Sequence, residues 1–266
     1  MKTISIINLK GGVAKTISSI NIAHALAAKH GKKVLLIDND KQGNTSKFFK
    51  VHGYDEPSIA NVLTERNFDV KSAIKETEFK GLYILPANMN LLRADKEILL
   101  DVSRPQQTRL RKALEQIKDE YDYCVIDNAP DINMSVINAL VASDDVLVPV
   151  KIDRFTFDGL EQLVEQIEDV KEFNSGLVLR GCFVTMFQRN TVNKQGDKYL
   201  REHTSYPLFN TVIRKTVRVD QSTFEGLPLL ATRKSTAGED YESLVREYLG
   251  EVLVSDTKGG ARHGEI

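Results

Sequence analysis

The sequence predicts an α/β fold in which helices cover both faces of one mostly parallel, twisted sheet. Short apolar runs alternate with helical patterns almost from end to end, which is typical of βαβ units. Most of the apolar runs are continuous rather than alternating, as expected for strands that are covered on both faces. A chain of 266 residues can bury a core of this kind without disulfides or a structural metal.

The first half of the chain contains four predicted strands and two predicted helices. The strands are the apolar runs at Thr3–Leu9, Lys33–Ile37, Leu82–Leu85 and Tyr123–Ile126. Residues at helical spacing predict helices at about Thr16–His30 and Thr108–Glu120. Gly31 follows the first helix directly and is expected to be its C-cap.

The second half continues the alternation without an internal repeat or a low-complexity linker. Strands are predicted at Val146–Val150, Leu179–Met186 and Phe209–Ile213, and helices at about Ile132–Val141, Phe157–Glu172, Lys194–His203 and Gly238–Val252. We therefore expect one domain over residues 1–254. The polar, glycine-containing residues 255–266 are expected to form a flexible tail.

The composition is that of a cytosolic globular protein. Lys and Arg number 36 against 37 Asp and Glu, which gives a net charge of −1. Cys124 and Cys182 each lie in an apolar run without a CxxC pair or a His cluster, so we expect two buried structural thiols and neither a metal site nor a disulfide framework. The N-terminus lacks a signal peptide's apolar core, and no run is long enough for a membrane span.

A glycine-rich turn joins the first predicted strand to the first helix, and its sequence is Lys10-Gly11-Gly12-Val13-Ala14-Lys15-Thr16. Glycines there let backbone N–H groups approach an anion, and the helix N-terminus adds partial positive charge. A Lys can reach the β/γ-phosphates of a nucleotide, and a Thr hydroxyl can hold Mg²⁺. The generic phosphate-loop pattern fails at Leu9 and Ala14, where it has glycines, so a turn with incidental lysines is the alternative.

Carboxylates end two further predicted strands. Asp38 and Asp40 follow one apolar run, and Asp127 follows another. Ligands bind parallel α/β sheets at this edge, where one carboxylate can order the Mg²⁺ shell and another can position an attacking water. Each alone could be a helix N-cap or a turn residue. Their convergence with the glycine-rich turn favours nucleotide chemistry.

These segments together resemble the deviant-Walker ATPases of the ParA/MinD family, specifically the ParA-like, Soj-type partition ATPases. The turn matches the family's K-G-G-V-G-K-[ST] except at Ala14, and residues 38–44 are similar to its D-x-D-P-Q-G-N. Residues 121–130 resemble Y-D-Y-I-I-I-D-C-P-P, and further matches follow in the family's order at 137–140, 148–150, 159–160, 185–186, 213–218 and 226–228. The resemblance implies a single P-loop NTPase domain.

The resemblance also implies roles for individual residues, with ATP and Mg²⁺ as the ligands. Residues 10–17 would form the nucleotide-binding loop, and these are Lys10, Gly11, Gly12, Val13, Ala14, Lys15, Thr16 and Ile17. Lys15 would bind the β/γ-phosphates, while Thr16, Asp127 and Asp38 would serve the Mg²⁺ site. Asp40 would orient or activate water. Lys10 would be the signature lysine that crosses to the partner's phosphates in an ATP-dependent sandwich homodimer, much as an arginine finger does.

Four departures from the family pattern lie in or near this loop. Ala14 adds a methyl group, Ile17 replaces a Thr, Lys41 replaces a Pro, and Asn128-Ala129 alters the segment after Asp127. Nucleotide affinity is therefore expected to be weaker than is typical of the family. Because no charged catalytic group is missing, we expect a slow ATPase, with a binding-only switch as the alternative.

A basic stretch between residues 185 and 220 contains seven Lys and Arg residues against three acids, which gives it a net charge of +4. By composition alone it is a solvated helix face and loop. The resemblance implies sequence-independent binding of double-stranded DNA by the dimer, through Arg189, Arg214, Lys215 and Arg218.

The function implied by the resemblance is DNA partition: an ATP-bound dimer coats the nucleoid in the cytoplasm, and a ParB-like partner on the cargo DNA stimulates hydrolysis. A MinD-like membrane-surface ATPase is the alternative from another class, although residues 251–266 do not have the pattern of a basic amphipathic helix. An iron–sulfur carrier on the same fold lacks a cysteine pair. A ParA-like positioner of a protein cargo would differ only in its partner.

Overall fold

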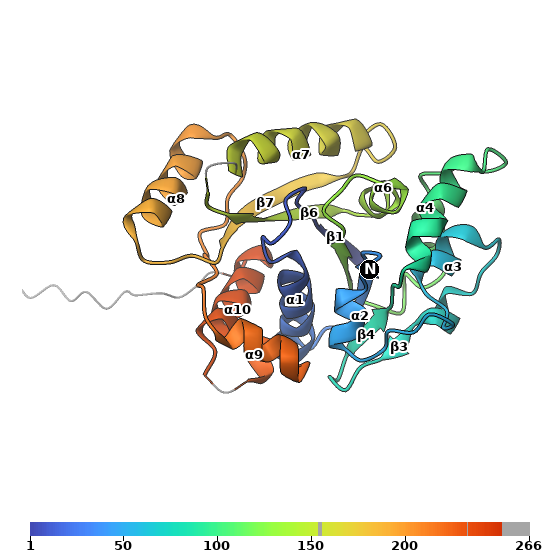
Figure 1. Cartoon of the computed structure of the whole chain (residues 1–266), viewed down its shortest axis with the longest axis horizontal. Helices are drawn as coiled ribbons and strands as arrows, with labels where there is room; N and C mark the ends of the chain where they lie inside the picture. The colour runs from blue at the N-terminus through green and yellow to red at the C-terminus, as the bar shows by residue number, and fades with distance from the viewer. Residues whose placement is uncertain (154–155, 233, 252–266) are drawn as a thin grey trace, which may run out of the picture.

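The computed structural model describes residues 1–153, 156–232 and 234–251 (Figure 1). The predicted tail at 255–266 lies outside the described residues. Seven strands form one sheet in the order β3-β4-β2-β5-β1-β6-β7. Their bounds are β1 Lys2–Ile6, β2 Val34–Asn39, β3 Lys75–Glu76, β4 Leu82–Leu85, β5 Tyr123–Asn128, β6 Asp145–Lys151 and β7 Val178–Thr185. Every neighbouring pair is parallel except β3 with β4, so the predicted fold class is confirmed.

Helices lie on both faces of the sheet (Figure 1). The α-helices are α1 Lys15–His30, α2 Asn44–Phe48, α3 Ile59–Thr64, α4 Asn90–Leu100, α5 Arg109–Glu115, α6 Met134–Val141, α7 Thr156–Val170, α8 Thr191–His203, α9 Arg218–Glu225 and α10 Thr236–Tyr248, and two short 3₁₀ helices span Val70–Ala73 and Leu229–Ala231. As predicted, Gly31 closes α1 in a left-handed conformation, with φ of 63°.

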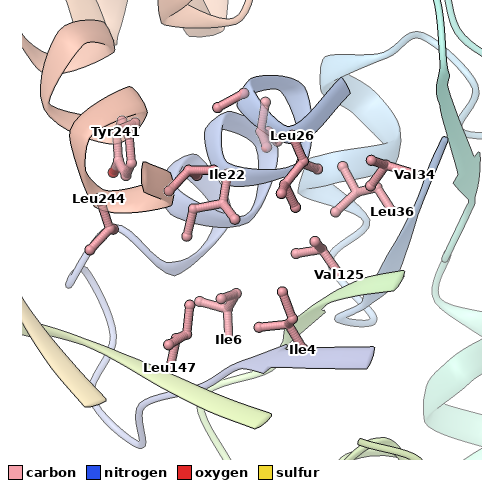
Figure 2. Close-up of a cluster of buried hydrophobic side chains, with 14 of the residues drawn as sticks. Ile4, Ile6, Ile22, Leu26, Val34, Leu36, Val125, Leu147, Tyr241 and Leu244 are labelled. Carbon is pink, nitrogen blue, oxygen red and sulfur yellow. The ribbon is translucent and has the colours of Figure 1, made fainter. Parts of the chain in front are cut away.

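The side chains of β2 alternate between two hydrophobic cores. Val34 and Leu36 pack with α1 and α10, whereas Leu35 and Ile37 pack with α3, α4, α5 and α6. Figure 2 shows the first core, in which Ile22 and Leu26 of α1 lie over β1, β2 and β5. A third core joins β6 and β7 to α6, α7 and α8. This double covering explains why the strand sequences are continuously apolar.

The predicted strand Phe209–Ile213 is wrong. This segment runs beside β7 and bonds to it at its ends, where Phe209 N donates to Cys182 O at 2.9 Å and Ile213 N to Val184 O at 2.8 Å. Between those bonds, the amides of Asn210 and Thr211 donate to the Glu247 carboxylate of α10 at 2.6 and 3.0 Å. The carboxylate takes donors that a strand would direct to its neighbour, so only isolated bridges form.

Several short elements have no counterpart in the sequence prediction: β3, α2, α3, α4 and α9. The predicted helix at Thr108–Glu120 is regular only to Glu115. Cys124 and Cys182 are buried free thiols, as expected. Within the described ranges, no helix combines the length and apolar character needed to cross a membrane.

Candidate active site

The strand ends bring the predicted site residues together. Asp38 of β2 is the register partner of Asp127 on β5, and Asp127 also pairs with Ile6 at the end of β1. The loop that follows β1 leads to α1, which begins at Lys15. The glycine-rich loop and the carboxylates therefore share one edge of the sheet, as the sequence predicted.

The loop between β1 and α1 contains two left-handed residues, Gly12 with φ of 71° and Ala14 with φ of 67°. Glycine adopts this conformation freely, but the Cβ of Ala14 makes it strained. A Cβ placed on Gly11 or Gly12 would meet no atom within 4 Å, so open space lies over the loop. The hydroxyl of Thr185, at the end of β7, donates a 3.1 Å hydrogen bond to Val13 O and so attaches the loop to the sheet.

Lys15 is buried at the start of α1, with 8% of its surface exposed. Its ammonium donates to the carbonyl oxygen of Lys10 at 2.9 Å, across the mouth of the loop. Burial lowers the pKa of Lys15, while the nearby carboxylates of Asp127 and Asp40 oppose that shift. The ammonium is thus held at the position from which it could reach an anion bound in the loop.

Asp127 is fully buried and accepts hydrogen bonds from several hydroxyls. Thr45 Oγ1 donates at 2.7 Å and Ser19 Oγ at 3.1 Å, and the Thr16 hydroxyl contacts the same carboxylate. Burial raises the pKa of Asp127 to about 6. Thr16 and Asp127 therefore place two oxygen ligands of the kind that Mg²⁺ prefers beside the loop.

Asp38 lies next to Asp127 and is equally buried. Ser46 donates to one oxygen through its amide at 2.8 Å and its hydroxyl at 2.6 Å, and the Asp40 amide donates to the other oxygen at 3.2 Å. Burial, and then the Asp127 charge, raise the pKa of Asp38 to about 7. These bonds join Asp38 to α2 and to the start of the Asp40 loop.

Asp40 and Lys10 lie on the solvent side of this network. Asp40 is partly buried, and its carboxylate accepts the amide hydrogen of Gln42 at 2.9 Å. Lys10 forms an ion pair with Asp153 of the same chain. Ile17, predicted to line the nucleotide loop, packs against the core beside α1.

The basic stretch divides into two kinds of residue. Arg189, Lys215 and Arg218 are exposed, in the turn before α8 and at the start of α9. Arg214 instead forms a two-pronged pair with Asp240 of α10, with Nη2 to Oδ1 at 2.7 Å and Nε to Oδ2 at 2.9 Å. Its guanidinium also donates to Thr236 O at 3.1 Å. Arg214 therefore attaches this segment to α10.

Sequence reasoning missed several side chains that shape the site. Thr45 and Ser46 on the five-residue α2 serve Asp127 and Asp38, and Asp153 engages Lys10. Two hydroxyls in the turn after the D-x-D segment were a possible signal for Thr45 and Ser46. No local pattern points to Asp153, which comes from the end of a different strand.

Comparisons with known proteins show which family this chain resembles. Residues 1–179 match the protein family described as "AAA domain". The chain is 36% identical over 254 residues to the sporulation initiation inhibitor protein Soj of Bacillus subtilis, covering 92% of this chain and 97% of Soj. It is also 36% identical over 255 residues to the chromosome partitioning protein ParA of Caulobacter vibrioides, covering 94% of each chain.

Solved structures match the fold over nearly the whole chain. Cobyrinic acid a,c-diamide synthase from Mycobacterium smegmatis, solved with an ATP analogue and magnesium, superposes with a TM-score of 0.83 at 26% identity and covers 94% of both chains. The Pyrococcus furiosus cell division ATPase MinD superposes with a TM-score of 0.76 at 22% identity, covering 94% of this chain and 98% of MinD. The MinD likeness extends to the fold alone.

Proposed function

The chain belongs to the ParA/Soj family of partition ATPases, and we propose that it is a Mg²⁺-dependent ATPase that dimerises with ATP, binds DNA non-specifically and positions a DNA cargo. The observation that carries this proposal is the Lys15 ammonium, buried beside Asp127 and donating to a carbonyl oxygen of the glycine-rich loop. A phosphate oxygen of ATP could replace that carbonyl oxygen.

The loop fits a triphosphate and its metal ion. The open space over Gly11 and Gly12 leaves room for phosphates, and the left-handed residues expose backbone N–H groups. Thr16 and Asp127 would hold Mg²⁺, which supplies neutralisation of the phosphate charge when bound. The raised pKa of Asp127 is consistent with a buried carboxylate that a bound cation would keep ionised.

Hydrolysis and dimerisation would use the two residues on the solvent side. Asp40 would orient the attacking water, since it is the least buried of the three carboxylates at Asp38, Asp40 and Asp127. Lys10 would leave Asp153 and cross to the phosphates of a second copy, which would otherwise repel those of the first. Lys10 would thus exchange the Asp153 carboxylate for the ATP phosphates of the second copy, which would couple dimerisation to ATP.

DNA binding would use Arg189, Lys215 and Arg218, whose exposed side chains could contact phosphates. The nucleoid would then be the surface on which the dimer gathers, with a ParB-like partner stimulating hydrolysis. The relative named chromosome partitioning protein ParA supports a chromosome as cargo. A protein cargo on the nucleoid is the second candidate, because the same enzyme would serve either.

The decisive experiment measures molar mass by light scattering and phosphate release in parallel, with ATP and Mg²⁺. The wild-type protein should form an ATP-dependent dimer and hydrolyse ATP slowly. Asp40→Ala should form the dimer without turnover, and Lys10→Ala should bind ATP but remain a monomer. Wild-type protein that stays monomeric with saturating ATP, or turnover that survives Asp40→Ala, would contradict the proposal.

A further inference from the structure

The two neighbours of Asp40 in the sequence contact the last residue of β5 and the loop that follows it. Asn39 Nδ2 donates to Asn128 Oδ1 at 2.9 Å, and Lys41 Nζ lies 3.7 Å from Asp131 Oδ2. We propose that Asn39, Lys41, Asn128 and Asp131 form a bracket that positions Asp40 relative to Asp127 for hydrolysis. The inference rests on the proposed function, because it assigns positioning residues to the same ATPase site.

The inner half of the bracket is buried and tied to three strands. Asn39 ends β2 and Asn128 ends β5, and both are at most 1% exposed. The Asn128 amide group also donates to Ser5 Oγ and Ile6 O of β1, each at 3.2 Å. In addition, Ala129 N donates to Asn39 O at 3.3 Å. The start of the Asp40 loop is therefore attached to the strand that leads into the glycine-rich loop.

The outer half of the bracket joins residues on the solvent side. The side chains of Lys41 and Asp131 are 31% and 49% exposed, so solvent screens their attraction and its effect should be small. Lys41 directly follows Asp40, and Asp131 directly follows Ala129-Pro130. Asp40 is therefore held through the residue on each side of it in the sequence.

A contribution to folding stability does not explain why Asn39 and Asn128 are asparagines. Within the described part of the chain, the buried Oδ1 of Asn39 has no hydrogen-bond donor. A buried acceptor without a donor lowers the free energy of unfolding, and an apolar side chain would avoid that cost. Positioning explains why an amide is present, because only a directional group can set the distance between the two loops.

The hydrogen bonds of Asp40 itself do not attach it to β5. Asp40 donates through its amide to Asp38, and its carbonyl oxygen and carboxylate accept the amide hydrogens of Gly43 and Gln42. These bonds lie within residues 38–43, so they shape the loop without attaching it to β5. The bracket supplies that attachment.

The test compares steady-state ATP hydrolysis with separately measured ATP affinity. Asn39→Ala should lower kcat about tenfold, and Lys41→Ala and Asp131→Ala about two- to fivefold each, with ATP affinity changed less than about twofold. The Lys41→Ala/Asp131→Ala double variant should lose no more than either single variant. Lys41→Arg should restore near wild-type turnover, since it keeps the pair.

A matched control is available in Lys75→Ala. Lys75 pairs with Glu56 at 2.8 Å with side-chain exposures of 35% and 56%, close to those of Lys41 and Asp131, but it lies on the edge strand β3. Lys75→Ala should leave kcat unchanged.

Hydrogen exchange tests the bracket without hydrolysis. Asn39→Ala should speed exchange of the Ala129 amide, which donates to the carbonyl oxygen of Asn39 on the other strand. Unchanged exchange together with additive losses in the double variant would overturn the bracket. Failure of the wild-type protein to hydrolyse ATP would instead reject the proposed function, and the exchange result would still decide whether the two loops are joined.

Discussion

At the carboxyl edge of the sheet, Lys15, Asp38 and Asp127 are buried. Lys15 donates to the Lys10 carbonyl oxygen, and the two carboxylates accept hydrogen bonds from α2. Around the start of α9, Lys215 and Arg218 lie exposed on the surface. The first arrangement fixes charge at defined points, where desolvation strengthens its effect on a bound anion. The second presents charge that salt can screen and that suits phosphates at no fixed position. Substitutions should therefore have large, specific effects at the edge and small, salt-dependent effects on the surface.

The largest effect is expected at Lys15. Lys15→Ala should weaken ATP affinity about a hundredfold, because a charge-assisted hydrogen bond in a desolvated site is lost. Titration with a fluorescent ATP analogue in the presence of Mg²⁺ would measure it. Lys29→Ala, at the exposed end of the same helix, is the control and should bind ATP normally. Equal affinity for the two variants would remove Lys15 from the phosphate site.

Arg214 tests where the boundary between the two regions lies. Arg214→Ala should lower the free energy of unfolding by about 2 kcal/mol, because it leaves the Asp240 carboxylate without its main partner. Arg246→Ala, which breaks an exposed ion pair on the same α10, should cost about 0.5 kcal/mol or less. Urea unfolding compares them. If Arg214→Ala were as stable as wild type and weakened DNA binding, Arg214 would belong with the surface residues.

Arg218 should behave as a member of the exposed group. Arg218→Glu should weaken binding of the ATP dimer to any duplex by about tenfold and reduce the salt slope by about 0.9 for each DNA phosphate that the protein no longer neutralises. Stability and ATP affinity should not change. Lys118→Glu, beside Met1 at the amino end of β1, is the control. Equal salt slopes for wild type and Arg218→Glu would make this surface an ordinary solvated face.

The smallest effect is expected at Ala14. Ala14→Gly should raise the free energy of unfolding by about 0.5 kcal/mol, because relief of left-handed strain of about 1 kcal/mol is partly offset by glycine's greater freedom in the unfolded chain. Ala28→Gly, in the exposed last turns of α1, should change stability in the opposite direction. A stability loss in both variants would mean that the methyl group of Ala14 makes a useful contact.

The sequence predicts the features that depend on local residue patterns and misses those that depend on distant partners. Continuous apolar runs are local, so the predicted strands at Lys33–Ile37 and Tyr123–Ile126 are found as β2 and β5, and the motifs at their ends converge. The strand predicted at Phe209–Ile213 fails because Glu247, far along the chain, takes its amides. The difference between Arg214 and Arg218 likewise depends on Asp240, which no local pattern reveals. Local sequence patterns therefore do not predict polar contacts between residues that are far apart in the chain.

The two edges of the sheet bear on how copies of this chain can associate. At one edge, β3 has only two residues, both charged, and it runs antiparallel to β4. At the other edge, β7 is flanked by the segment around Phe209, which bonds to it at isolated points. Among the residues that the structure describes, neither edge offers a long, flat row of free amides and carbonyls, the feature that lets sheets extend from one molecule into the next. Both edges are thereby protected against pairing with another copy into a continuous intermolecular sheet.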